Sequence, residues 1–134
     1  MVGPELIEKF VAPVTSKIGK KLGPVRLHSC GFSTNHLVAF SKITNLHSLD
    51  LGGDTSIKRA RQIFGKDMLI SVAPLPRDMS AESVEPIINW AKRIFEENDG
   101  NKLEYIYHVE ENYNIDTIRA LTDYVKNLPD FKSA

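Results

Sequence analysis

The sequence predicts an α/β fold of four βα units with parallel strands, preceded by an N-terminal helix. Short apolar segments recur four times along the chain, and each is followed by a polar or glycine-containing loop. After each loop comes a segment whose apolar residues recur at helical spacing. Strands that alternate with helices are joined by right-handed crossovers and form a parallel sheet. No low-complexity linker divides the 134 residues, so we expect a single domain, residues 1–134.

The first helix is predicted over residues 4–22. Its apolar residues, which recur near helical spacing, are Leu6, Ile7, Phe10, Val11, Val14 and Ile18. Pro13 lies inside this segment and is expected to kink the helix, because proline lacks an N–H and its ring clashes with the preceding turn. Gly23 and Pro24 then end the helix.

The four strands and the helices between them follow in order. The predicted strands are residues 25–30, 46–51, 68–73 and 103–109. The first two helices are predicted over residues 35–43 and 55–64, the second ending at Gly65. A long third helix is expected to begin with Ser80 as its cap, to bend at Pro86 and to end before residues 98–100. The last helix, residues 114–128, ends at Pro129.

The charge and composition exclude several classes of function. Lysine plus arginine equals aspartate plus glutamate, 17 each, so no net field attracts nucleic acid or an anionic membrane. The N-terminus lacks the pattern of a signal peptide, and no run of about 18 apolar residues occurs. We therefore expect a cytoplasmic protein without a nucleic-acid or membrane partner. Cys30 is the single cysteine and is a structural thiol, a reactive thiol or a metal ligand.

Four βα units amount to half of a TIM-type (β/α)8 barrel, which typically needs about 250 residues. A four-stranded parallel sheet standing alone leaves two strand edges open to solvent or to another chain. Three arrangements of the chain are consistent with these open edges. The chain associates, with a second copy or a separately encoded N-terminal half; it is a piece of a larger protein; or it forms a small open sheet.

The end of the first strand carries the most informative residues, His28 and Cys30. Residues two apart on a strand project from the same face, so an imidazole and a thiol converge where a βα loop begins. This spacing starts a zinc site, or else it is a buried thiol beside a hydrogen-bonded histidine. Arg26 shares their face and is expected to pair with an internal Asp or Glu, or else to bind a substrate carboxylate.

Asp50 ends the second strand, at the edge where barrel enzymes build their sites. It is either a catalytic residue or a loop residue that binds the next helix N-terminus. Gly52 and Gly53 follow it, without the lysine of a nucleotide loop or the wider glycine spacing of a dinucleotide turn. A phosphate-binding loop is therefore not predicted.

Two segments together resemble the C-terminal half of the uroporphyrinogen decarboxylase superfamily. Residues 4–13 read PELIEKFVAP and residues 25–31 read VRLHSCG, similar to the family's PEL-to-Phe-to-Pro helix and its strand ending H-x-C-G. Residues 46–50, LHSLD, resemble the family's next strand, and Pro76 matches the proline of a later turn. The resemblance covers nearly the whole chain and about two-fifths of a family member, and it implies an eight-fold βα barrel.

The resemblance implies one of two chemistries. The residues that define the tetrapyrrole decarboxylases of this superfamily lie largely in the N-terminal half. Its corrinoid-dependent methyltransferases hold zinc with His-x-Cys and a later cysteine and thereby activate a thiol that accepts a methyl group. His28 and Cys30 match the first two zinc positions and favour this branch, with a corrinoid protein as a partner. This chain has no second cysteine, and residues 72–76 lack the family's Gly-Asn and Asp.

His108 and Glu110, predicted to share a face at the end of the last strand, are the candidate replacements for the missing ligand. Glu110 is alternatively the solvated start of the last loop. The expected function is thus that of a fragment or subunit of a zinc-dependent methyltransferase that moves a methyl group between a corrinoid and a thiol. The alternatives are a non-catalytic half-barrel module that associates with itself or with an N-terminal half, and a relic of a tetrapyrrole decarboxylase.

Overall fold

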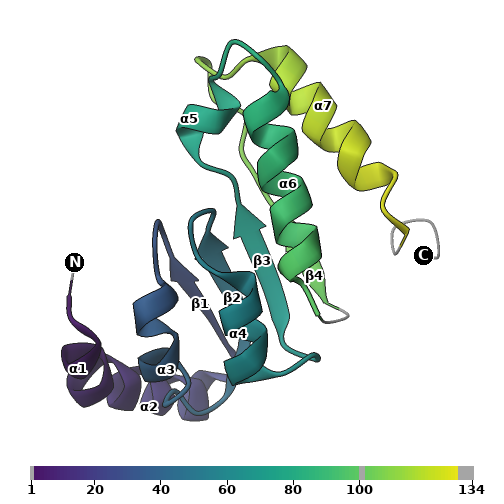
Figure 1. Ribbon diagram of the computed structural model, residues 1–134. Coiled ribbons are helices and arrows are strands. Elements are labelled where there is room, and N and C mark those ends of the chain that lie inside the picture. Colours follow the sequence, from purple (N-terminus) through teal and green to yellow (C-terminus); the bar gives the residue numbers. More distant parts are fainter. Residues whose placement is uncertain (1, 100–101, 130–134) are drawn as a thin grey trace.

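Four parallel strands form one sheet in the order β1-β2-β3-β4, as the sequence predicts (Figure 1). The computed structural model describes residues 2–99 and 102–129. The strands are β1 (Val25–Ser29), β2 (Leu46–Gly52), β3 (Leu69–Ala73) and β4 (Leu103–Tyr105). Each strand is hydrogen-bonded to the next along the chain, so the α/β fold with four βα units and an N-terminal helix is confirmed, and it is compatible with half of a TIM-type barrel.

The helical segments before and between the strands are α1 (Pro4–Leu6), the π-helical η1 (Ile7–Val11), α2 (Ala12–Leu22), the 3₁₀ turn η2 (Thr34–His36), α3 (Leu37–Phe40), α4 (Ile57–Phe64), α5 (Pro76–Met79), α6 (Glu85–Glu97) and α7 (Ile115–Lys126). No described helix has both the length and the apolar character needed to cross a membrane.

The N-terminal helix passes Pro13 through a π-helical turn, at the position where the proline is expected to kink the helix. The N–H of Ala12 donates to the carbonyl of Ile7, five residues back, immediately before Pro13. A wider turn at this point moves the preceding carbonyls away from the proline ring, which has no N–H to offer them. The segment therefore stays helical from Pro4 to Leu22.

The third predicted helix is wrong in one respect, because two helices take its place. Ser80 does not cap a long helix; it is the C-cap residue of α5. Pro86 lies in the first turn of α6 and does not bend it. A proline is tolerated there because the first N–H groups of a helix have no intrahelical acceptor.

The last strand is shorter than predicted. β4 ends at Tyr105, and the N–H of Ile106 makes the last bond of the ladder, to the carbonyl of Val72. Pro74 follows the neighbouring strand β3 and has no N–H to continue the pairing. The expectation that His108 and Glu110 share a face of a strand is therefore wrong, since residues 106–110 belong to no strand.

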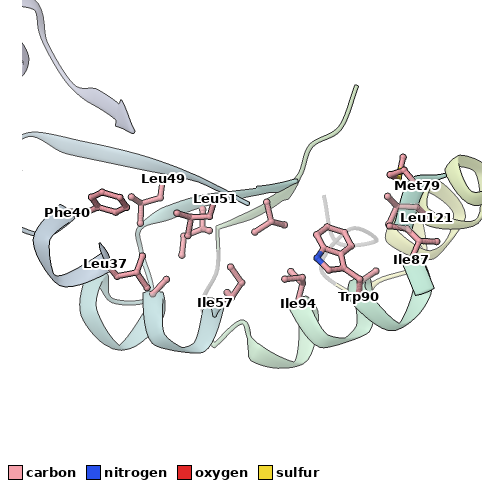
Figure 2. Packing of buried hydrophobic residues seen from close by; sticks show 14 of the residues in the cluster. Leu37, Phe40, Leu49, Leu51, Ile57, Met79, Ile87, Trp90, Ile94 and Leu121 are labelled. Carbon is pink, nitrogen blue, oxygen red and sulfur yellow. The ribbon is translucent and has the colours of Figure 1, made fainter. Parts of the chain in front are cut away.

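The apolar side chains of the sheet point toward one layer of helices. In Figure 2, Leu49 and Leu51 of β2 point toward the helix layer that carries Ile57. Figure 1 shows α3, α4 and α6 on that side of the sheet. Because side chains alternate along a strand, the opposite face carries polar residues at intervening positions. They are Arg26, His28, Ser48, Asp50, Ser71 and Glu104.

Glu97, at the end of α6, caps the start of α4. Its Oε2 accepts hydrogen bonds from the N–H groups of Ile57 and Lys58, at 2.8 and 3.2 Å. Burial alone would raise the pKa of Glu97, but the N–H of Lys58 and the guanidinium of Arg93 hold it below its ordinary 4.5. The charged carboxylate therefore joins two helices that are 40 residues apart in the chain.

The first prediction concerns this cap. Because the pKa of Glu97 is lower in the folded chain than in the unfolded chain, its stabilisation is present above about pH 4.5 and is lost as the pH falls through the folded value. Glu97→Gln should lower the free energy of unfolding by about 1 kcal/mol at neutral pH. Urea denaturation at pH 7 and at pH 3 measures this difference, which should shrink at pH 3. Glu96→Gln, at an exposed neighbouring carboxylate, is the control; an equal effect of both variants would contradict the cap.

Candidate functional site

A cavity of about 400 Å³ lies at the carboxyl ends of the strands. His28 and Cys30 enter it from the end of β1, and Asp50 enters it from β2. Tyr107 and His108, which follow β4, line the other side. Parallel α/β sheets bind their ligands at this edge, because the loops after the strands gather there. The cavity thus brings together four of the five residues that the sequence analysis selected.

Cys30, His28 and Asp50 make a continuous chain of contacts. The Nε2 atom of His28 lies 2.7 Å from the Sγ atom of Cys30. Its Nδ1 atom lies 2.9 Å from the Oδ2 atom of Asp50. A neutral imidazole that donates Nδ1–H to this carboxylate presents an unprotonated Nε2 to the sulfur. Asp50 therefore fixes the orientation of the ring, and His28 faces the thiol with a lone pair.

Asp50 is the buried member of this group, with a side chain only 12% exposed. Its Oδ2 also accepts a hydrogen bond from Arg26 Nη2 at 3.2 Å, which confirms the expected internal partner of that arginine. Its Oδ1 is buried and has no hydrogen-bond partner among the described residues. Asp50 does not cap the next helix, because Ser56 is the N-cap residue of α4. The carboxylate instead belongs to the site.

The two candidate ligands after β4 are placed differently. His108 lines the cavity, and its side chain lies in an exposed part of the chain. Glu110 is exposed and does not line the cavity. Within residues 2–99 and 102–129, no three His, Cys, Asp or Glu side chains are arranged as a group that could hold a metal ion. The structure thus assembles two of the four predicted ligands and brings a third, His108, to the same cavity.

The loop after β1 is held in place by residues that the sequence analysis did not select. Thr55 is fully buried; its Oγ1 donates to the carbonyl of Gly31 and accepts from the N–H of Ser33, each at 3.0 Å. Gly31 has a φ of 70°, in the left-handed region that favours glycine. The backbone of Gly52 lies directly against Gly31, and a Cβ at position 52 would overlap it, at 2.8 Å from the Cα of Gly31. The glycine that ends β2 is therefore needed for the close approach of this strand end to the loop after β1.

The residues present can supply part of a zinc site. A zinc-binding histidine usually donates its other ring N–H to a carboxylate, as His28 does to Asp50. Zinc held at about 2.0 Å from nitrogen and about 2.3 Å from sulfur in tetrahedral geometry separates the two ligand atoms by about 3.5 Å. The observed 2.7 Å is shorter than this separation, so the exposed Cys30 side chain must rotate outward to admit a metal. His28 and Cys30 fit two positions, and His108 is the candidate for a third.

Comparison with known proteins adds no assignment. No family model matches the chain, and no curated protein matches it in sequence.

Proposed function

We propose that this chain is the C-terminal half of a uroporphyrinogen decarboxylase-like barrel whose site activates a thiol for methyl transfer to or from a corrinoid, with zinc bound by His28 and Cys30. The observation that carries this proposal is the convergence of His28 Nε2 and Cys30 Sγ, with Asp50 on the other ring nitrogen. This arrangement lies in a cavity at the carboxyl ends of parallel strands, where barrel enzymes hold their reactive groups.

Each residue has a defined part in the proposed reaction. Bound zinc would act as a Lewis acid that lowers the pKa of a substrate thiol, so that the thiolate predominates near neutral pH. His28 and Cys30 hold the metal, and Asp50 keeps the imidazole of His28 oriented. Arg26 in turn anchors the carboxylate of Asp50. A corrinoid, when bound, would supply or accept the methyl group that the sulfur of the activated thiol exchanges.

Two further parts of the proposal go beyond His28, Cys30 and Asp50. A corrinoid must reach the cavity, and we propose that a separate corrinoid protein carries it. The remaining zinc position requires a donor beyond His28 and Cys30, and His108 lines the same cavity. The cavity of about 400 Å³ gives room for a small thiol but not for a whole corrinoid, so the cofactor would approach from the open side.

A second candidate function uses the same three residues without metal. The order Cys30, His28, Asp50 is that of a nucleophile, its general base and the group that orients the base. The continuous contacts from Sγ to Nε2 and from Nδ1 to Oδ2 favour this alternative. Its substrate would be an ester or an amide. The sulfur of Cys30 would form a thioester with the acyl carbon as the bond to the alcohol or amine breaks, and His28 would pass the thiol proton to that leaving group.

The second prediction separates the two candidates. We expect the chelator-treated chain to bind one zinc ion, measured by competition with a chromogenic chelator, and Cys30→Ser or His28→Ala to weaken this binding by about 100-fold or more. Asp50→Asn should weaken it by about 10- to 100-fold, since it removes the carboxylate behind His28. His47→Ala, at an exposed histidine that does not line the cavity, is the control and should bind as the parent chain does.

Iodoacetamide labelling of Cys30 tests the second candidate, the metal-free nucleophile. If the chain binds no zinc, and if its thiol reacts at neutral pH much faster in the parent than in His28→Ala, the metal-free nucleophile is the better assignment. If zinc binds and protects Cys30 from labelling, the methyl-transfer proposal stands. Absence of both zinc binding and enhanced labelling would contradict both candidates.

A further inference from the structure

The sheet has two edges that differ in chemistry, β1 and β4. Each of these strands is paired on one side only within the described residues. Unpaired edges offer N–H and C=O groups to another strand. β4 makes only three ladder pairs, and residues 106–110 continue beyond it without a strand partner. Both edges are therefore open to pairing.

The polar face of the sheet carries opposite charges at these two edges. Arg26 on β1 has a side chain that is 51% exposed, and it lies on the face of Asp50. Glu104 on β4 is exposed and accepts a hydrogen bond from Ser71 Oγ at 2.8 Å. The ladder aligns Asp50 with Ser71 and Ser71 with Glu104, which places the cation and the carboxylate on one face at opposite edges. The two edges are thus complementary to each other.

An apolar stripe lies on the helix that leads into β1. Its members recur at every fourth position from α1 to α2, and their exposed fractions range from 49% to 79%. They are Leu6, Phe10, Val14, Ile18 and Leu22. The buried side of the same helix carries Ile7, Ala12 and Gly19. A continuous exposed stripe of this kind is typical of a surface that another chain covers.

Exposed apolar side chains also follow the opposite edge. Val109, after β4, is 68% exposed, and Ile115, at the start of α7, is 53% exposed. The chain has a formal net charge of zero, so two copies do not repel one another through net charge. Each edge of the sheet therefore has both a charge and apolar side chains available for contact.

We propose that a second copy of this chain docks against both edges, with β1 of each copy pairing with β4 of the other around a two-fold axis parallel to the strands. This operation keeps all strands parallel and satisfies both open edges at once. The resulting eight strands are the number that closes a βα barrel. Arg26 and the second copy's Glu104 then lie on the same face of the β1–β4 junction, and we expect the stripe from Leu6 to Leu22 to be covered. The inference concerns the sheet edges and does not depend on zinc or on methyl transfer.

The third prediction is that the chain forms this dimer. Sedimentation velocity of the 134-residue chain, from micromolar to submillimolar concentration, measures it. The parent chain should sediment with the mass of two chains. Phe10→Glu in the stripe and Glu104→Lys at the β4 edge should each raise the dissociation constant by about tenfold or more. Arg59→Glu, at an exposed position of α4, which lies between α3 and α6 in the helix layer, is the control and should dimerise normally. Circular dichroism checks that each variant is folded.

Two results of the sedimentation experiment would overturn the proposed dimer. A parent chain that is still monomeric at the highest concentration overturns the proposal. The proposal is equally overturned if that monomer binds a different four-stranded half-barrel that is supplied separately. A dimer that both Phe10→Glu and Glu104→Lys retain overturns it too, because association then uses another surface. Zinc binding is measured separately at the monomer concentration, so failure of the metal site leaves the dimer result unaffected, and the reverse also holds.

Discussion

Replacing Arg61 with methionine should lower the free energy of unfolding by about 4 kcal/mol, which corresponds to a fall in Tm of roughly 10 °C or more. Arg61 is only 6% exposed. Its Nη1 donates to the carbonyl of Met68 at 2.6 Å, and its Nη2 donates to the carbonyl of Lys102 at 2.9 Å. The guanidinium therefore joins the loop before β3 to the loop before β4.

The size of this effect follows from what the substitution leaves behind. Methionine fills much of the volume but donates no hydrogen bond, so the carbonyls that faced the guanidinium are left unsatisfied. Burial lowers the pKa of Arg61, an effect that the carboxylate of Asp99 partly offsets, and the group nevertheless stays charged at neutral pH. A buried cation that joins two loops is costly to remove because its buried partners lose their donor.

Arg59→Met on the same helix is the matched control. Arg59 is exposed, and its guanidinium donates to the side chain of Gln62, at 3.1 Å. We expect its substitution to change the free energy of unfolding by no more than about 0.5 kcal/mol. Chemical denaturation of both variants measures the difference. Equal stabilities of the two variants would show that the Arg61 network does not stabilise the fold.

The same residue illustrates which part of the fold could be predicted from the sequence. The four strands and their parallel order follow from apolar segments that alternate with helical periodicity. In α4, this periodicity identifies Ile57, Ala60, Ile63 and Phe64 as the inner face. Arg61 lies on that buried side as well, and periodicity assigns charges to solvent. Its acceptors come from loops that are brought together only by the folded sheet, so no local pattern could indicate them.

The candidate site was predictable where it depended on strand alternation and not where it depended on strand length. The shared face of His28 and Cys30 follows from their spacing, and the observed contact between them agrees with it. The placement of Glu110 depended on a strand that continues to residue 109, whereas the ladder stops where Pro74 removes a donor from the neighbouring chain segment. The contact of Asp50 with His28 joins two neighbouring strands, so predicting it would have required the register between β1 and β2.

The substitution Gly52→Ala should lower the free energy of unfolding by about 3 kcal/mol and displace the loop that carries Cys30. The added Cβ would overlap the backbone of Gly31, lying 2.5 Å from its carbonyl oxygen. Backbone atoms cannot rotate away as a flexible side chain can, so residues 30–33 must shift as a unit. The shift should break the 2.7 Å contact between Cys30 and His28, which zinc affinity or the rate of Cys30 labelling reports.

Two glycine controls separate steric overlap from the cost of backbone conformation. Gly31→Ala meets no atom within 4 Å but has a φ of 70°, so we expect it to cost about 1–2 kcal/mol without displacing the opposite loop. Gly3→Ala meets only the carboxylate of Glu5, at 3.9 Å, and should be nearly neutral. If Gly52→Ala were as stable as Gly3→Ala and kept the reactivity of Cys30, the packing of Gly52 against Gly31 would not position the site. If Gly52→Ala were unstable but kept the contact of His28 with Cys30, the end of β1 would hold these two residues without help from the end of β2.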